Sequence, residues 1–224
     1  VHFGSFCSIV VYYRKMIAEI LGDLLKSISP AGIKSGEYRT NSNAQFSYII
    51  LLSMIPAFVV GMTLKDQIEQ LFNSPFFVSW MLIATGVLLF LTRFVKKAEE
   101  NVSAGRGFLM GVAQAFAIIP GISRSGSTIS VGLFLGVNRY HVANFSFLMV
   151  LPVLAGAMAL EALELFEKGV DPSAVYILLT GFFTSFISGY LALSYLITVL
   201  RREKFFYFAY YCWVIGIAGI FYFY

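Results

Sequence analysis

Apolar runs close to the length that crosses a membrane recur along the whole chain, and this pattern limits the possible folds more than any other feature. A helix needs about 20 mostly apolar residues to span the hydrocarbon core of a bilayer. Six such runs occupy residues 1–13 (extended by an amphipathic continuation to residue 25), 44–64, 76–94, 140–163, 174–200 and 205–224. Charged residues make up only 12% of the chain, against about 25% in a soluble domain. The sequence therefore predicts an all-α integral membrane protein with six transmembrane helices.

A further apolar stretch, residues 107–137, is interrupted by the sequence PGISRSGST at residues 120–128. This segment places one arginine and four hydroxyl groups between two runs that carry no charge. An arginine at membrane depth costs about 2.5–3.5 kcal/mol on insertion scales, so a functional role is the default interpretation. A guanidinium matches phosphate geometry, and glycines, hydroxyls and a following helix start complete an anion cradle. The segment predicts a phosphate site inside the bilayer.

The distribution of positive charge predicts how these segments cross the membrane. The basic segments, which hold 13 of the 16 basic residues, are residues 14–39, 93–106, 139 and 201–204, whereas residues 65–70 and 164–171 are net acidic. Basic loops are enriched on the cytoplasmic side. With the basic segments inside, residues 107–137 have to enter and leave on one side, as a re-entrant helical hairpin that passes the membrane midplane without spanning it. The Pro-Gly break predicts that its two short helices are joined by a loop at residues 121–126. Val1 and Tyr224 are then expected outside.

The order of the spans predicts an inverted repeat. Three spans precede the hairpin and three follow it, so two such halves are oppositely oriented, and sites in such folds lie near the midplane. We divide the single membrane domain, residues 1–224, into an incomplete first repeat (1–106) and a second repeat (107–224). The chain starts at Val1 without an initiator methionine or a basic leader. A matching first hairpin is therefore expected upstream of Val1.

The residues from Gln114 to Thr128, with PGISRSGST at their core, resemble the bacterial undecaprenyl-diphosphate phosphatase family, known for bacitracin resistance. Further matching stretches are residues 2–5, 10–14, 54–57, 136–139, 146–148, 152 and 206–211. The resemblance covers essentially the whole chain. It implies six spans and two re-entrant hairpins in a bacterial cytoplasmic membrane. It also implies removal of the terminal phosphate from undecaprenyl diphosphate, which recycles this carrier lipid for cell-wall synthesis.

The resemblance also assigns site residues. It implies catalytic roles for Ser123, Arg124 and Thr128, and substrate contacts for Gln114, Gly121, Ser125, Gly126 and Ser127. We interpret Arg124 as the group that grips the diphosphate and stabilises the charge that develops in the transition state. Ser123 and Thr128 are expected to donate further hydrogen bonds, together with backbone N–H groups at the helix start.

Each of these assignments has a structural alternative. Hydroxyls before a helix are ordinary N-caps, so Ser127 or Thr128 could cap the outgoing leg while Ser123 faces the substrate. Gln114 could form only a hydrogen bond between helices. Arg124 could cap helix ends from inside the protein.

The family's second motif, a glutamate-rich stretch followed by serines and a histidine, lies upstream of Val1. The resemblance therefore places the ligands of a divalent cation, Mg²⁺ or Ca²⁺, and the group that activates the nucleophile in that missing segment. We assign no metal ligand within the chain, and His2, His141 and Glu161 are interpreted as structural. The 224-residue chain alone is expected to be inactive.

Two other classes of function fit the same pattern. Broken helices at the midplane also describe secondary transporters, so a transporter or flippase for a phosphate-bearing lipid is the main alternative. A catalytically inactive structural fragment is the third class. The expected partners are a polyprenyl diphosphate lipid and the membrane, and no nucleic acid. The oligomeric state, the metal, the nucleophile, the lipid chain length and the side to which the site opens stay open.

Overall fold

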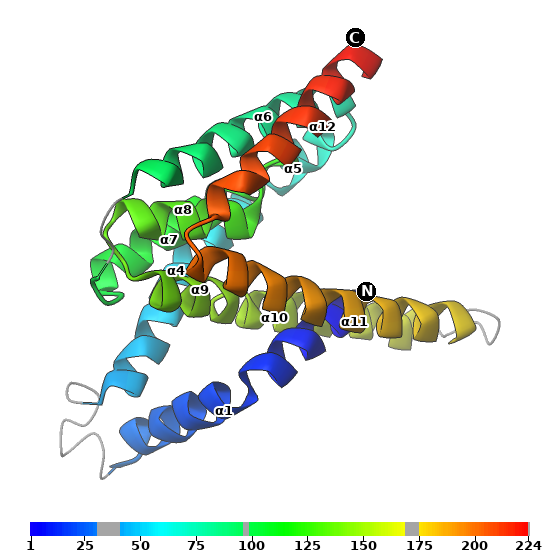
Figure 1. Cartoon of the computed structure of the whole chain (residues 1–224). Coiled ribbons are helices and arrows are strands. Elements are labelled where there is room, and N and C mark those ends of the chain that lie inside the picture. Colours follow the sequence, from blue (N-terminus) through cyan, green and yellow to red (C-terminus); the bar gives the residue numbers. More distant parts are fainter. Residues whose placement is uncertain (31–40, 96–98, 169–174, 224) are drawn as a thin grey trace. The chain divides into compact units, whose positions relative to one another are not determined.

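The computed structural model describes residues 1–30, 41–95, 99–168 and 175–223, and every regular element within these ranges is a helix (Figure 1). Within the described residues, five helical stretches are long and apolar enough to cross a membrane: Ser42–Thr63, Pro75–Phe94, Arg139–Leu163, Val175–Arg201 and Phe205–Phe223. Each of them coincides with one of the runs predicted from the sequence. The protein is an all-helical, multi-pass membrane protein.

The remaining predicted run forms α1 (His2–Ile28), which is not one of these five stretches. Its first half is apolar, but its second half carries Arg14, Lys15 and Glu19, followed by further charged residues. Such a density of charge is costly in hydrocarbon. Length and composition alone therefore single out five spans rather than six.

One compact unit comprises residues 1–48 and 147–196, that is α1, the start of α4 (Ser42–Thr63), α10 (Leu151–Lys168) and most of α11 (Val175–Arg201). Small residues bring α1 and α11 together in this unit. A Cβ atom at Gly4 would collide with Ser185, and one at Gly189 would lie 2.8 Å from the Ser8 Oγ. Close approach through small side chains is how helices gain van der Waals contact in a membrane.

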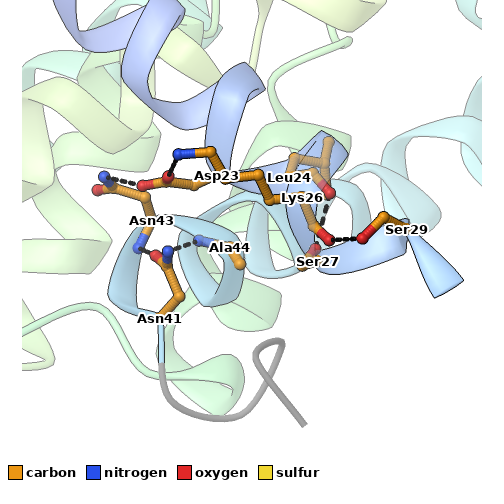
Figure 2. A network of polar contacts seen from close by, with 8 residues as sticks. All are labelled: Asp23, Leu24, Lys26, Ser27, Ser29, Asn41, Asn43 and Ala44. Atoms are coloured by element: carbon orange, nitrogen blue, oxygen red, sulfur yellow. Dashed lines mark hydrogen bonds and ion pairs between the residues drawn. The ribbon is translucent and has the colours of Figure 1, made fainter. Parts of the chain in front are cut away.

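Polar side chains join the end of α1 to the start of α4 in the same unit (Figure 2). The Asn41 Oδ1 accepts hydrogen bonds from the backbone N–H groups of Asn43 and Ala44, at 2.9 and 3.2 Å. Asn43 Nδ2 donates to the Asp23 carboxylate at 2.8 Å, and the Lys26 ammonium lies 3.6 Å from the same group. Asn41 thus caps the first turn of α4, where backbone N–H groups need acceptors.

The second compact unit comprises residues 49–146 and 197–224, with most of α4, α5 (Lys65–Leu71), α6 (Pro75–Leu91), α7 (Ala104–Phe116), α8 (Arg124–Phe134), most of α9 (Arg139–Leu148) and α12 (Phe208–Phe223). Two short 3₁₀ turns, Thr92–Phe94 and Phe205–Tyr207, also belong to it. Within this unit, α6 and α12 lie side by side, as do α7 and α8 (Figure 1).

Glycine and tryptophan interlock α6 with α12. A Cβ atom at Gly86 would collide with the Trp213 ring, and one at Gly216 would lie 2.8 Å from the Ile83 Cγ1 and 2.9 Å from the Ser79 carbonyl oxygen. The Trp213 Nε1 donates to the Ile83 carbonyl oxygen at 3.3 Å. The pair is two uninterrupted apolar helices, in which Ser79 and Trp213 find hydrogen-bond partners within the pair.

Residues 107–137 contain the two short helices α7 and α8, of 13 and 11 residues. The break between them covers residues 117–123, whereas the sequence predicts a loop over residues 121–126. This boundary is wrong because α8 begins at Arg124, so that Arg124, Ser125 and Gly126 form its first turn. The arginine therefore projects from the start of a helix and not from a loop.

The chain leaves the α7–α8 pair next to the point where it entered. The Glu100 N–H donates to the Gly136 carbonyl oxygen at 3.1 Å, and the Glu100 carbonyl oxygen accepts from the Asn138 N–H at 2.9 Å. Gly136 has φ +79°, a conformation that favours glycine. Residues on the two sides of the pair thus meet in a short backbone bridge.

Candidate functional site

The segment between α7 and α8 lies directly against α6. Gly121 has φ +89°, and a Cβ atom there would collide with the Val78 carbonyl oxygen and lie 2.8 Å from the Met81 Cβ. Both the backbone conformation and the lack of space require glycine at this position. The interaction with α6 fixes where the first turn of α8 begins.

Thr85 of α6 forms two hydrogen bonds with the segment between α7 and α8. Its Oγ1 donates to the Gly121 carbonyl oxygen at 3.0 Å and accepts from the Ser123 N–H at 3.2 Å. The side chain is 1% exposed, so both bonds are shielded from water and lipid. Thr85 cannot be predicted as a site residue from the sequence, because a single threonine in an apolar run carries no signal of a partner 36 residues away.

Ser123 is the N-cap of α8. Its Oγ accepts from the Gly126 N–H at 3.1 Å, and its carbonyl oxygen accepts from the Ser127 N–H at 2.8 Å. A Cβ atom at Gly126 would lie 2.9 Å from the Ser123 Cβ and Oγ, so glycine lets the cap close. The expectation that Ser127 or Thr128 provides the cap is therefore wrong: it comes from Ser123. The half-buried Ser123 hydroxyl accepts here and keeps its own hydrogen for another acceptor.

Arg124 reaches from α8 to α9. Its Nη1 donates to the Ser146 carbonyl oxygen at 2.9 Å. Within the described ranges, no carboxylate lies within ion-pair distance of the guanidinium. A guanidinium has five N–H donors, so this half-buried side chain retains donors for an anionic ligand. The arrangement is that of a cation held in place without its charge being neutralised.

Thr128 lies about one helical turn after Arg124 on α8. It is 0% exposed, and its Oγ1 lies 3.0 Å from the Arg124 carbonyl oxygen and 2.6 Å from the Ser146 Oγ. Ser125, in contrast, is half-buried and has no hydrogen-bond partner for its hydroxyl in the part of the chain that the structure describes. The hydroxyl groups that the sequence brings together thus separate into a half-exposed pair, Ser123 and Ser125, and buried ones.

Gln114 of α7 faces α8 close to this cluster. Gly132 of α8 packs on Met110 of α7, where a Cβ atom would lie 3.0 Å from the Met110 Sδ. In two antiparallel helices with this register, Gln114 is opposite Thr128, one turn closer to the break. Its amide is 4% exposed, and neither amide atom has a hydrogen-bond partner among the described residues.

The Ser127 Oγ is likewise buried without a hydrogen-bond partner in these residues. Buried polar groups nearly always have partners in native proteins, so such groups point to a ligand or to water. Gln114 and Ser127 remain predicted substrate contacts, together with Gly121, Ser125 and Gly126. The structure brings all of them to one end of the α7–α8 pair.

The composition of the cluster suits an anion and not a metal ion. It supplies one guanidinium, hydroxyl groups, an amide and the free N–H groups at the start of α8, which carries partial positive charge. Divalent cations such as Mg²⁺ require oxygen ligands that include carboxylates. The described residues contain no group of three or more His, Cys, Asp and Glu side chains that could hold a metal. The cluster by itself therefore does not fit a divalent cation.

The two histidines have partners of other kinds. In the first compact unit, His2 Nδ1 lies 2.6 Å from the Glu161 carboxylate, and both side chains are more than half exposed. In the second unit, His141 contacts the Tyr140 ring edge-on, with centroids 5.6 Å apart. These contacts agree with the structural roles expected for both residues.

Comparisons with known proteins agree with the resemblance seen in the sequence. Residues 1–218 match the family model described as bacitracin resistance protein BacA. The undecaprenyl-diphosphatase of Christiangramia forsetii is 39% identical over 222 residues, which are 98% of this chain and 79% of that protein. The undecaprenyl-diphosphatase of Salinibacter ruber is 38% identical over 220 residues, 98% of this chain and 81% of that protein. The chain belongs to the BacA family of bacitracin resistance proteins.

Proposed function

We propose that the protein hydrolyses undecaprenyl diphosphate to undecaprenyl phosphate and inorganic phosphate, and so recycles the carrier lipid of cell-wall synthesis. The relatives that match almost the whole chain are named for this activity. The single observation that carries the proposal is the Arg124 guanidinium, which is held by a carbonyl oxygen and not neutralised by a carboxylate of the described residues. A phosphate oxygen is the natural partner for its remaining donors.

The roles of the residues follow from their partners. Arg124 binds the diphosphate and stabilises the charge on its oxygens as the phosphoryl group is transferred. Ser123 donates the hydrogen that its capping role leaves free, and Ser125 and Ser127 supply further hydroxyl groups. Gln114 offers an amide donor opposite α8. Backbone N–H groups in the first turn of α8 add partial positive charge.

We further propose that residues 107–137 form a re-entrant hairpin. At about 1.5 Å per residue, α7 and α8 reach about 20 and 17 Å, short of a hydrocarbon core of about 30 Å. The backbone bridge from Glu100 to Gly136 and Asn138 supports entry and exit on one side. Arg139 connects the basic segments around residues 95 and 203. Its Nη2 lies 3.3 Å from both the Val95 carbonyl oxygen and the Glu203 carboxylate, which supports placing these segments on the same side of the membrane.

The positive-inside rule makes that side the cytoplasm. With α1 as a sixth span, Val1 and Tyr224 then lie on the outer side, and residues 1–106 and 107–224 are two repeats of opposite orientation. Three spans on each side of the hairpin support this arrangement. The polyprenyl tail would lie among the spans, in the bilayer.

We also propose that efficient hydrolysis requires an acid–base group, and the carboxylate ligands of a divalent cation, from residues outside the arginine–hydroxyl cluster. The cluster offers no carboxylate or imidazole, the usual groups for proton transfer. The 224-residue chain alone is therefore predicted to release phosphate far more slowly than the full-length protein. Equal rates in the two preparations would make Ser123 or Ser125 the leading candidate for the nucleophile.

The proposed function is tested with full-length protein purified in detergent and supplied with undecaprenyl diphosphate and Mg²⁺ or Ca²⁺. The expected result is one inorganic phosphate released for each undecaprenyl phosphate formed. Transport of the lipid across reconstituted vesicles without phosphate release would instead make the protein a lipid transporter.

A further inference from the structure

Ser146 is linked to Arg124 directly and also through Thr128, although it lies 22 residues away. Its carbonyl oxygen accepts from the Arg124 Nη1 at 2.9 Å. Its Oγ lies 2.6 Å from the Thr128 Oγ1, which in turn lies 3.0 Å from the Arg124 carbonyl oxygen. Ser146 therefore acts on the guanidinium end of the arginine directly and on its backbone through Thr128.

The direct contact uses a feature of helix ends. Ser146 is among the last four residues of α9 (Arg139–Leu148), whose carbonyl oxygens lack partners within the helix. The C-terminal end of a helix also carries partial negative charge, which favours a nearby cation. The end of α9 thus offers the guanidinium an acceptor and a favourable field, without the full charge of a carboxylate that would compete with phosphate.

The indirect contact depends on which hydroxyl donates. A hydroxyl group has one hydrogen to donate. Either hydroxyl can donate in the 2.6 Å bond between Thr128 and Ser146, and when Thr128 donates to the Arg124 carbonyl oxygen instead, the hydrogen between the two hydroxyls comes from Ser146. Both residues are 0% exposed, so water does not compete for these bonds. Thr128 therefore has no hydrogen left for a substrate oxygen in this arrangement.

We propose that Ser146 is a positioning residue for Arg124, and that Thr128 transmits its effect; this role rests on the proposed phosphatase function. The substrate would contact the half-buried hydroxyls of Ser123 and Ser125. Ser146 and Thr128, which are buried, would hold the Arg124 guanidinium in its orientation. Holding a charged group in the geometry of the transition state is the main contribution that proteins make to phosphoryl transfer.

The test is a double-mutant cycle in the full-length protein, with phosphate release from undecaprenyl diphosphate as the readout. Ser146→Ala removes the hydroxyl and keeps the carbonyl oxygen. The control is Ser79→Ala, because Ser79 is also buried and its hydroxyl donates to the Pro75 carbonyl oxygen of its own helix, α6. Both substitutions are also made in an Arg124→Lys background, and binding of a non-hydrolysable methylene-diphosphonate lipid is measured for every variant.

Ser146→Ala is expected to lower kcat/KM about tenfold and to weaken binding of the analogue, while Ser79→Ala changes neither. In the Arg124→Lys background, Ser146→Ala is expected to have little further effect on either quantity, because the group that it orients is gone. Equal losses in both backgrounds, or no loss with arginine present, would overturn the positioning role. A wild-type protein that releases no phosphate would instead contradict the proposed function itself.

Discussion

The second compact unit contains two helix pairs that differ in whether their buried polar groups have hydrogen-bond partners. In the α6–α12 pair, the Ser79 Oγ donates to the Pro75 carbonyl oxygen at 2.8 Å and the Trp213 Nε1 donates to that of Ile83 at 3.3 Å. In the α7–α8 pair, the Gln114 amide and the Ser127 and Ser130 hydroxyls are buried without hydrogen-bond partners among the described residues.

We interpret this difference as one between a structural pair and a pair that holds the proposed site. Leaving a buried polar group without a partner costs about 1–3 kcal/mol, so such groups persist where a ligand or water can satisfy them. The α6–α12 pair is also continuous, whereas the α7–α8 pair is broken at the point where Arg124 projects. The two pairs therefore provide matched positions at which the same type of substitution should change phosphate release by very different amounts.

The largest difference is expected for arginine replaced by lysine. Arg124→Lys keeps the charge and loses the planar fork of donors. Removing one preorganised donor costs about 10²–10³ in turnover, and we expect a loss of that size in phosphate release. The matched control is Arg93→Lys, since the Arg93 guanidinium lies over the Phe206 ring at 5.5 Å. Comparable turnover in the two variants would show that Arg124 does not contact the transition state.

A smaller difference is expected for glycine replaced by alanine. Gly121→Ala introduces strain at φ +89° and a collision with the Val78 carbonyl oxygen, so the segment must shift away from α6. A displacement of about 1 Å in a catalytic group can cost about 10²-fold, and we expect a loss of about 10- to 100-fold in kcat/KM.

In the α6–α12 pair, Gly219→Ala meets only the Ser79 side chain, whose hydroxyl can rotate away. We expect activity within about twofold of the wild type for this variant. Circular dichroism and thermal unfolding of both variants check that they are folded. If Gly121→Ala had full activity, the close approach of α6 would not be needed to place Arg124.

The smallest difference is expected for threonine replaced by valine. Thr85→Val keeps the branched shape and removes the bonds to Gly121 and Ser123, which should lower kcat/KM about tenfold. Thr92 lies at the end of the same apolar segment, and its Oγ1 donates to the nearby Leu89 carbonyl oxygen at 2.6 Å. Thr92→Val is expected to change kcat/KM by less than about twofold. Equal losses of kcat/KM in Thr85→Val and Thr92→Val would show that Thr85 has no special role in holding the segment before α8.

The sequence was sufficient to predict the helical membrane class, five of the apolar spans and the family. Apolar run length and charge distribution determine these features locally, so they can be read without knowing the fold. The anion site at residues 120–128 stays a prediction, which rests on the cost of an arginine between two uncharged apolar runs in a membrane.

The residues that hold Arg124 in place could not be predicted in the same way. Thr85 and Ser146 are 36 and 22 residues from their partners, and an isolated hydroxyl in an apolar run has no periodicity or spacing that reveals such a partner. The helix boundary was also misplaced, since glycine and serine at positions 123–126 suggest a loop. Here Ser123 caps the helix and Gly126 makes room for the cap, so these residues begin α8.

The most direct test of the central claim asks whether the first turn of α8 is a diphosphate site reached from water. Cys7 and Cys212 are replaced by alanine, and single cysteines are placed at Ser125 and, as a control in the structural pair, at Val87 on the exposed face of α6. Reaction with a charged, membrane-impermeant thiol reagent is then followed with and without inorganic diphosphate. We expect Ser125→Cys to react, diphosphate to slow that reaction, Arg124→Lys to abolish the protection, and Val87→Cys to stay unreactive in lipid. Reaction of Ser125→Cys at the same rate with and without diphosphate, or no reaction at all, would contradict the account.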